Sequence, residues 1–408
     1  MLNWSKQFSI FCLLDNHQYN FSHPQFECLL AAGSIKVLQA TPGKAFDNLQ
    51  DFTVNENDWI FGHLSYDLKN EIEQLSSGNY DGVGFPDMFF FVPEIVLILK
   101  ESKVDIGIVN GDTDVIFSMI HSVEAEQRIE QPVPVINKRF SKTEYLETVK
   151  QIQQHILRGD CYEINFCQEF YAEDCVIDPL DVYLKLGQLS PNPFAGFYKL
   201  DDKFLLCSSP ERYLKKQGNK IYSQPIKGTS PRNLHNAEED EQNKILLSGS
   251  EKEISENVMV VDLVRNDLSK VCLEGSVKVD ELFGIYSFPQ VHQMISTVSG
   301  TLDNNVAFAD ILTATFPMGS MTGAPKKSVM ELIEKYERTK RGLFSGAIGY
   351  ITPLGDFDFN VVIRSILYNA ANKYVSMQSG SAITFYSEAS KEYEECLLKM
   401  NAMKKVLE

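Results

Sequence analysis

The lysine at position 227 has the most distinctive chemical setting in this sequence, within the segment 223–229. Pro225 restricts the backbone before Lys227 and Gly228 permits a tight turn after it, so the side chain leaves from a stiff segment. Burial lowers the pKa of a lysine, and the neutral amine is a nucleophile. Lys227 is therefore a candidate for covalent catalysis, although the segment alone fits a solvated turn lysine better.

Two pairs of glutamates have a spacing that suits a divalent cation. Glu253 and Glu256 are three residues apart, and Glu392 and Glu395 repeat this spacing near the C-terminus. Residues three apart share one face of a helix, so each pair would present two carboxylates together. Carboxylate oxygens are ligands that Mg2+ accepts. The alternative is two solvated helix faces, which a chain with 55 acidic residues makes easy to accept for each pair alone.

A further carboxyl and an arginine stand where a substrate would need them. Glu211 follows a predicted strand and precedes the strand that leads to Lys227, so it is a candidate general acid or base; a surface ion pair with Arg212 is the alternative. Arg364 lies in an otherwise apolar strand. A buried arginine needs an anionic partner, and a substrate carboxylate would serve.

A glycine-containing loop and a histidine complete the set of candidates. The loop 318–326 leads into a predicted helix, and a helix N-terminus is suited to bind a carboxylate or phosphate; a capped helix start is the alternative. His292 has apolar residues on both sides. This favours a hydrogen-bonded core histidine over a catalytic one.

Strands and helices must bring these residues together. Short runs rich in β-branched and aromatic residues predict that residues 1–110 are mostly strands. Strands and helices do not alternate regularly, so the predicted fold class is α+β: two packed, antiparallel-rich sheets that form a sandwich with outer helices. Helical spacing predicts helices over 112–127, 141–158 with a capping box at its start, 180–189, 238–270 with a break near 248–250, 308–316, 325–338 and 390–407.

Composition limits the partners that this chain can have. The formal net charge is −17, which argues against nucleic acid and anionic membranes as partners. The eight cysteines include no CxxC pair, so we expect reduced thiols in a cytoplasmic protein. No apolar run is long enough to cross a bilayer. Prolines at positions 132 and 134 exclude helix there, which suggests an N-terminal β-rich subdomain over residues 1–130 and a catalytic region over 140–408.

Several separated motifs, taken together, resemble the chorismate-utilising enzymes: anthranilate synthase component I, aminodeoxychorismate synthase component I, isochorismate synthase and salicylate synthase. The resemblance covers about residues 141–407. It extends more weakly into the N-terminal part through residues 66–70, so residues 1–130 are expected to resemble the N-terminal region of anthranilate synthase component I. The motifs are residues 159–162, 209–212, 227–229, 252–267, 319–326 and 392–395.

Two positions select a branch within the resemblance. Aminodeoxychorismate synthases are expected to carry a nucleophilic lysine at position 227, where anthranilate and isochorismate synthases are expected to carry alanine. Isochorismate and salicylate synthases are expected to place a general-base lysine where this chain has Glu163. The family pattern more often has glutamine there, so the resemblance gives Glu163 no role. Anthranilate synthase component I and a silent subunit that only binds a glutaminase remain as alternatives.

The resemblance implies a chorismate-dependent transferase of 4-aminobenzoate and folate biosynthesis. Lys227 would attack C2 of chorismate, Glu211 would protonate the departing C4 hydroxyl, and ammonia would then yield 4-amino-4-deoxychorismate. Mg2+ would be held by Glu256 and Glu395, with Glu253 and Glu392 around it. The implied substrate contacts are Thr229, His292, Ser320, Tyr350, Arg364, Lys399 and Gly380, the last in a carboxylate-binding turn over 378–382 where Ala382 replaces an expected glycine.

The source of ammonia is expected on another chain. The sequence has no cysteine within a glycine-rich amidotransferase loop, so the resemblance implies a separate glutamine amidotransferase subunit as partner. We also expect no second catalytic domain for removing pyruvate, because none fits in 408 residues, so the product should be passed on. Tryptophan binding in the N-terminal part and the oligomeric state stay open from the sequence.

Overall fold

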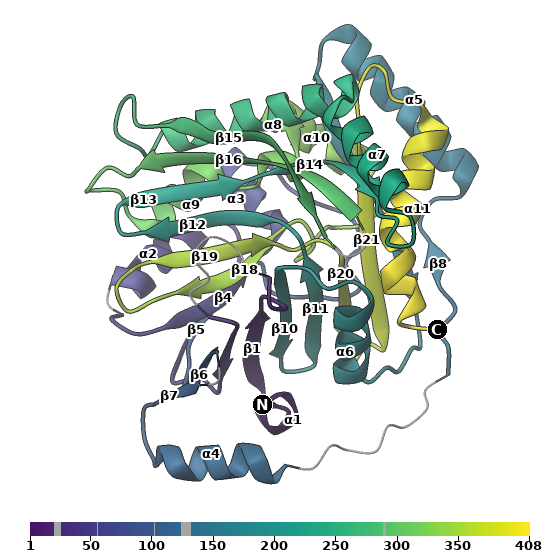
Figure 1. Ribbon diagram of the computed structural model, residues 1–408. Helices are drawn as coiled ribbons and strands as arrows, with labels where there is room; N and C mark the ends of the chain where they lie inside the picture. The colour runs from purple at the N-terminus through teal and green to yellow at the C-terminus, as the bar shows by residue number, and fades with distance from the viewer. Residues whose placement is uncertain (20–25, 55, 102, 124–131, 289–290) are drawn as a thin grey trace.

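Two antiparallel sheets form the centre of the molecule (Figure 1). The computed structural model describes residues 1–19, 26–54, 56–101, 103–123, 132–288 and 291–408. Within these residues, the first sheet has 11 strands and the second has 10. Every pairing between named strands is antiparallel, as the sequence predicted.

The first sheet combines N-terminal strands with strands from the rest of the chain. Its order is β17 (Gly323–Ala324), β9 (Glu163–Ala172), β21 (Tyr374–Ile383), β20 (Ser365–Asn369), β11 (Lys203–Ser209), β10 (Phe194–Leu200), β1 (Ile10–Asp15), β2 (Cys28–Ala32), β6 (Ile95–Lys100) and β7 (Lys103–Ile108), with β8 (Asn137–Lys138) also paired to β9.

The second sheet is mixed in the same way. Its order is β14 (Ile226–Pro231), β16 (Val291–Thr301), β13 (Lys220–Gln224), β12 (Arg212–Gln217), β19 (Phe357–Val361), β18 (Ala347–Ile351), β4 (Ile60–Leu64), β5 (Met88–Val92) and β3 (Lys36–Ala40), with β15 (Lys278–Ser287) also paired to β16.

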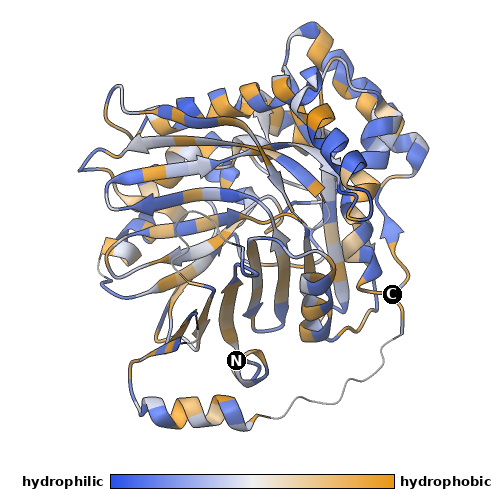
Figure 2. Ribbon diagram, viewed as in Figure 1, coloured by the Kyte–Doolittle hydropathy of each residue, from blue (hydrophilic) through white to orange (hydrophobic). Residues whose placement is uncertain are grey.

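Helices surround the sheets and carry both polar and apolar residues, as Figure 2 shows for α5, α8 and α11. Such helices cover a sheet with one face and meet solvent with the other. The helices are α1 (Leu2–Ser5), α2 (Ala45–Val54), α3 (Lys69–Glu73), α4 (Thr113–Ser122), α5 (Lys142–Arg158), α6 (Pro179–Leu189), α7 (Ala237–Ser248), α8 (Glu251–Ser269), α9 (Phe308–Thr315), α10 (Lys326–Tyr336) and α11 (Ala389–Lys405), with 3-10 turns η1 (Tyr66–Leu68) and η2 (Gly319–Met321).

The two sheets pack face to face, which explains the apolar character of their central strands. In β1, Cys12 and Leu14 join the core cluster between the sheets, while Phe11 and Leu13 join the cluster beneath the outer helices. A strand buried on both faces needs apolar residues at consecutive positions. A direct contact also links the sheets, because His63 Nδ1 in β4 lies 3.1 Å from the hydroxyl of Tyr198 in β10.

The helices predicted from the C-terminal two thirds of the sequence are present. Helix α5 begins with the expected capping box between Ser141 and Glu144. Helices α7 and α8 meet at Gly249, close to the predicted break. Helix α8 packs along β14 and β16 of the second sheet, and α11 packs along β21 of the first. Helix α8 therefore covers part of the second sheet, and α11 covers part of the first.

The prediction that residues 1–110 are mostly strands is confirmed in their described part, where β1 to β7 lie beside the helices α1 to α3, and these strands join both sheets. Two other sequence predictions need correction. The predicted turn over 378–382 lies inside β21, which pairs with β9 from Val375 to Ile383. The predicted helix over 112–127 ends at Ser122. Residues 124–127 of it, and part of the predicted linker, fall outside the described residues.

The thiol prediction is confirmed where it can be tested. All eight cysteines are free, and all but the half-buried Cys272 are buried. In the described part of the chain, no helix combines the length and the apolar character needed to cross a bilayer.

Candidate active site

A cavity of about 440 Å³ lies where α8 and α11 stand over the two sheets. Its wall is built from β9 and β21 of the first sheet, β14 of the second sheet, both helices and the connection between β11 and β12. Most of the residues that the sequence nominated converge here. The nominated residues that line it are Glu211, Lys227, Thr229, Glu253, Glu256, Ser320, Arg364, Gly380, Glu395 and Lys399.

Lys227, in the wall of this cavity, forms a buried ion pair with Glu163. Its Nζ donates a 2.6 Å hydrogen bond to Oε1 of Glu163, and the two side chains are 9% and 3% exposed. Burial acts to lower the pKa of Lys227, but the carboxylates of Glu163 and Glu256 outweigh it, and the pKa is raised. The predicted lowering of this pKa is therefore wrong for the free protein, because the sequence could not show the partner carboxylate.

Gly228 allows the strand that carries Lys227 to approach α8 closely. Its φ is 92°, a conformation that favours glycine. A Cβ atom there would lie 3.1 Å from Oε2 of Glu253 and 3.2 Å from the side chain of Leu247. The glycine therefore brings the nucleophile candidate next to the acidic face of α8.

Glu211 has the protonation behaviour of a general acid. Burial raises its pKa to about 7, against the opposing effects of the Ser320 hydroxyl and the Lys227 ammonium. Ser320 Oγ donates a 2.6 Å hydrogen bond to Glu211 Oε1. Arg212 does not pair with Glu211, because it forms a two-pronged ion pair with Asp358 at 3.0 and 3.1 Å. A carboxyl that titrates near pH 7 can hold and release a proton at neutral pH.

The glutamate pairs do face one another from α8 and α11. Lys252 Nζ lies 3.0 Å from Glu392 Oε1 and 3.7 Å from Glu256 Oε1. Burial raises the pKa of Glu256 to about 8, and the nearby carboxylates add to this effect. Glu392 is buried but does not line the cavity, whereas Glu253 and Glu395 do.

A divalent cation fits the chemistry of these side chains. Oε1 of Glu256 and Oε2 of Glu392 are buried and make no hydrogen bond. Buried carboxylate oxygens that lack a hydrogen bond suit a hard cation. Nevertheless, no group of three His, Cys, Asp or Glu side chains in the described residues stands ready to hold a metal ion. Lys252, to which sequence reasoning gave no role, supplies the positive charge between the helices.

Two cations in the cavity are suited to an anionic ligand. Arg364 follows β19 in a left-handed conformation with φ of 52°, and burial lowers its pKa. Within the described part of the chain, no side chain forms an ion pair or hydrogen bond with its guanidinium. Lys399 pairs with Glu395 at 2.6 Å and donates a 2.9 Å hydrogen bond to the carbonyl oxygen of Gly380.

Gly380 is needed for strand pairing at this point. A Cβ atom there would lie 2.4 Å from the carbonyl oxygen of Phe166 and 2.5 Å from Sγ of Cys167 in β9. Such distances are far shorter than van der Waals contact. The neighbouring Ala382 is buried and also lines the cavity. The glycine therefore serves the close approach of two strands and not a turn.

Besides Glu392, two nominated residues do not line the cavity. His292 is fully buried, with Nε2 at 2.9 Å from Asp240 Oδ1 and Nδ1 at 2.9 Å from Ser287 Oγ, as a hydrogen-bonded core histidine would be. Its neighbour Gln293 lines the cavity instead. Tyr350 lies in a different cavity, so it does not share a site with Arg364.

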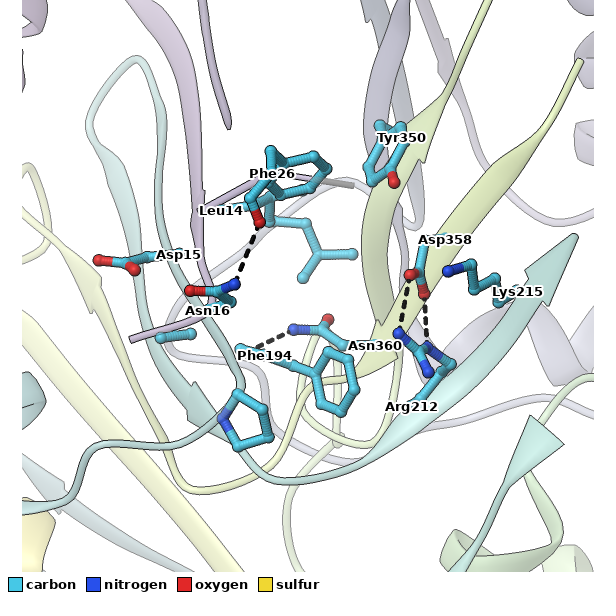
Figure 3. A pocket seen from close by; sticks show the side chains of 13 residues that line it. Leu14, Asp15, Asn16, Phe26, Phe194, Arg212, Lys215, Tyr350, Asp358 and Asn360 are labelled. Carbon is cyan, nitrogen blue, oxygen red and sulfur yellow. Dashed lines mark hydrogen bonds and ion pairs between the residues drawn. The ribbon is translucent and has the colours of Figure 1, made fainter. Parts of the chain in front are cut away.

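That second cavity measures about 70 Å³ and lies between the two sheets (Figure 3). Leu14 and Phe26 line it from the N-terminal part, and the ion pair between Arg212 and Asp358 lines it from the second sheet. Tyr350 packs against Phe26 at its edge. None of the other nominated residues lines this cavity.

Sequence reasoning missed polar residues on strands. Asn165, two residues after Glu163 in β9, lines the main cavity and donates a 2.9 Å hydrogen bond to the carbonyl oxygen of Ser320. Residues two apart in a strand point to the same side. That alternation was the available signal, because it places Glu163 and Asn165 on one face.

The site and fold define a class of enzyme that comparison with known proteins identifies. A family model described as chorismate binding enzyme matches residues 11–405. This chain belongs to that family. The resemblance found in the sequence motifs is thereby confirmed, as is the fold class.

Individual relatives lie in two branches of the family. Aminodeoxychorismate synthase component 1 of Escherichia coli (strain K12) is 33% identical over 349 residues, which cover 85% of this chain and 76% of that protein. Anthranilate synthase component 1 of Thermus thermophilus is 31% identical over 360 residues, which cover 86% and 77%. The crystal structure of anthranilate synthase component I from Streptococcus pneumoniae superposes with a TM-score of 0.78 at 26% identity, covering 97% of this chain and 92% of that one.

Proposed function

We propose that this chain converts chorismate and ammonia to 4-amino-4-deoxychorismate and water, with Lys227 as a covalent nucleophile. The observation that supports it most is the presence of Lys227 and Glu211 in the wall of one cavity. A lysine amine can form a covalent intermediate, and a carboxyl with a pKa of about 7 can protonate a departing hydroxyl. The similarity to aminodeoxychorismate synthase component 1 of Escherichia coli agrees with this choice.

Binding of chorismate would depend on the cations of the cavity. Chorismate carries two carboxylates. Arg364 has no partner in the described chain and offers a guanidinium, which suits a carboxylate in a two-pronged contact. Lys399 lines the same cavity from α11. Thr229 and Ser320 add hydroxyls that can orient the ring.

The reaction then proceeds in two displacements. The neutral Lys227 amine forms a bond to C2, the ring double bonds shift, and the C4–O bond breaks as Glu211 donates its proton to the leaving hydroxyl, which departs as water. Ammonia then forms a bond to C4, the double bonds shift back, and the C2–N bond to Lys227 breaks. Glu211 takes up a proton from the new ammonium group. Two easier steps replace one difficult displacement.

Mg2+ is proposed as the cofactor, held by Glu256 and Glu395 with Glu253 and Glu392 around it. When bound, it would supply Lewis-acid polarisation of a substrate carboxylate. The chain's own contribution is the buried acidic face of α8 and α11, whose unpartnered oxygens need a positive charge. Lys252 must leave its place between Glu256 and Glu392 for the carboxylates to close on a cation.

A glutamine amidotransferase subunit is proposed as the source of ammonia. The support is the name component 1 of the similar proteins, which indicates a further component. Anthranilate synthesis is the second candidate function, because the Thermus thermophilus and Streptococcus pneumoniae relatives carry that name. Lys227 speaks against it, since direct addition of ammonia at C2 would compete with the lysine for the same atom.

Product identification tests this proposal. The purified chain is mixed with chorismate and an ammonium salt at alkaline pH, with Mg2+ or with a chelator, and the products are separated and weighed by mass spectrometry. The proposal predicts that 4-amino-4-deoxychorismate forms when Mg2+ is present and does not form when the chelator is present. Anthranilate as the product would overturn it in favour of the second candidate.

A further inference from the structure

Glu163 is the one hydrogen-bond partner of the Lys227 ammonium among the described residues, and the function above gives it no task. Glu163 is the first residue of β9 in the first sheet, whereas Lys227 lies in β14 of the second sheet. The 2.6 Å hydrogen bond between them therefore crosses from one sheet to the other. Both side chains are nearly excluded from water.

Other charged groups face Lys227 but are engaged elsewhere. Glu256 on α8 lies beside Lys252, and Glu395 on α11 is paired with Lys399. Glu211, in the connection before β12, accepts the hydrogen bond of Ser320. Glu253 on α8 also contributes negative charge near Lys227. Among the residues that the structure describes, only Glu163 is within hydrogen-bond distance of the Lys227 Nζ and so can exchange a proton with it directly.

The ion pair creates a problem that the reaction must solve. An ammonium group has no lone pair and cannot attack C2. The cluster of carboxylates favours the charged form of Lys227 even though burial opposes it. A buried lysine in the charged form needs a proton acceptor within the site, at hydrogen-bond distance, before it can react as a nucleophile.

We propose that Glu163 is this acceptor and that it releases the Lys227 amine for attack on chorismate. This inference rests on the proposed function. The Glu163 carboxylate takes the proton of the Lys227 ammonium through the existing hydrogen bond, and the freed electron pair on Nζ forms the bond to C2 as the C4 hydroxyl leaves with the Glu211 proton. When ammonia has added at C4 and the C2–N bond breaks, Glu163 returns its proton to Nζ and both groups regain their charges.

Internal proton transfer has a kinetic signature that a purely structural ion pair lacks. With Glu163 as acceptor, no proton has to leave the site before attack, so adduct formation does not depend on bulk pH through Lys227. Without the acceptor, Lys227 must first lose its proton to water. The rate then rises about tenfold per pH unit below the pKa of the lysine.

Glu163→Gln is the matched variant, because glutamine keeps the shape and can still hydrogen-bond to Lys227. The protein is mixed with chorismate at saturating Mg2+, quenched with acid, and mapped for the Lys227 peptide that carries chorismate less water, from about pH 6 to about pH 8. Because the titration of Glu211 affects both proteins alike, its contribution cancels in the ratio of the variant rate to the wild-type rate. We expect a ratio well below one at the acidic end that rises steeply with pH. A ratio that does not change with pH would overturn the proposal.

A second measurement reports on Lys227 without chorismate. Cyanate carbamylates neutral amines and is small enough to enter the cavity. Since Glu163→Gln removes the carboxylate that accepts the Lys227 proton, Lys227 should react several-fold more slowly with cyanate in the variant at about pH 6. Lys399 keeps its Glu395 partner and serves as the internal control in the same peptide map. Equal reactivity of Lys227 in both proteins would contradict the assigned role.

The two levels of the account fail in different ways. If wild-type protein forms neither a Lys227 adduct nor 4-amino-4-deoxychorismate, the proposed function is wrong. If the adduct forms and the Glu163→Gln profile runs parallel to the wild-type profile, only the role of Glu163 is wrong. Glu163→Asp restores a carboxylate and should recover part of the wild-type pH dependence. This recovery would not be expected if Glu163→Gln had lost activity only because it fails to fold.

Discussion

The hydroxyl of Ser320 donates a 2.6 Å hydrogen bond to the carboxyl group of Glu211, two residues that lie 109 positions apart in the sequence. The hydrogen bond stabilises the charged form of Glu211 and so opposes the effect of burial on its pKa. Ser320 comes from the turn η2 and Glu211 from the connection between β11 and β12. The pH at which the candidate acid loses its proton therefore depends on a loop from a distant part of the chain.

Removal of the Ser320 hydroxyl should move the alkaline limb of the activity profile. Without this donor the pKa of Glu211 rises further, so the acid keeps its proton to higher pH, by up to about one unit. We expect kcat/KM of Ser320→Ala to fall off at higher pH than that of the wild type. Ser320→Thr retains a hydroxyl and should resemble the wild type. An alkaline limb at the same pH in all three proteins would speak against the link.

Glu211 should also make stability depend on pH in a definite direction. Burial is the main cause that raises its pKa in the folded protein from 4.5 to about 7. Between these values the folded state holds a proton that the unfolded chain has lost, so the free energy of unfolding falls as pH rises through this window. Glu211→Gln removes this contribution. Its free energy of unfolding should therefore fall less than that of the wild type between about pH 5 and about pH 7, and the difference between the two proteins is at most on the order of 3 kcal/mol.

Denaturant unfolding at the two ends of this pH range measures the effect. Glu331→Gln, at an exposed position of α10, is the control and should show the wild-type slope. The same slope for Glu211→Gln and the wild type would mean that Glu211 is not a buried, proton-binding group.

Arg364 should affect substrate affinity more than turnover. Its guanidinium lines the cavity and has no partner in the described chain, so a substrate carboxylate would be its first strong contact. Loss of a hydrogen bond to a charged group costs about 1.5–3 kcal/mol, which corresponds to about a 10–100-fold rise in KM for Arg364→Gln. Arg364→Lys keeps the positive charge but loses the planar guanidinium group. Its KM should therefore lie between those of the wild type and Arg364→Gln. Steady-state kinetics with chorismate would show this order, and an unchanged KM would place the carboxylate elsewhere.

Gly380 should be intolerant of a side chain for reasons of packing. In Gly380→Ala the new methyl group would lie 2.4 Å from the carbonyl oxygen of Phe166, so β21 and β9 must move apart. We expect a loss of about 1–3 kcal/mol in the free energy of unfolding. Gly78→Ala is the control, because a Cβ there meets nothing within 4 Å. Equal stability of the two variants would show that the strands separate at no cost.

The sequence predicted the chemical residues better than their neighbours in space. Glu211, Lys227 and the glutamates of α8 and α11 could be nominated because their types, spacing and order carry a recognisable chemistry. The pairing of Lys227 with Glu163 could not, since it joins strands of two different sheets. This pairing reversed the predicted direction of the lysine pKa.

Strand geometry explains the other departures. Tyr350 is of a suitable type to bind a carboxylate, but its side chain points to the cavity between the sheets. A shift of one residue changes the face of a strand, and periodicity cannot set that parity without the partner strands. The family resemblance implied a carboxylate-binding turn around Gly380, whereas long-range pairing with β9 makes these residues a strand.

The division of the chain into two regions stays a prediction, and strands of both regions lie in each sheet. The N-terminal strands β1, β2 and β6 extend the first sheet beyond β10, and β3, β4 and β5 extend the second sheet beyond β18. Neighbouring strands thus come from distant parts of the chain. Local composition marks where the chain is irregular, but it does not show which strands will pair.

The covalent role of Lys227 is the central claim, and mass analysis of the Lys227 peptide tests it most directly. The protein is mixed with chorismate and Mg2+ without ammonia, quenched with acid and digested. The account predicts that this peptide gains the mass of chorismate less one water, and that the adduct disappears as an ammonium salt yields 4-amino-4-deoxychorismate. An unmodified peptide, together with undiminished 4-amino-4-deoxychorismate formation by Lys227→Ala, would contradict the claim.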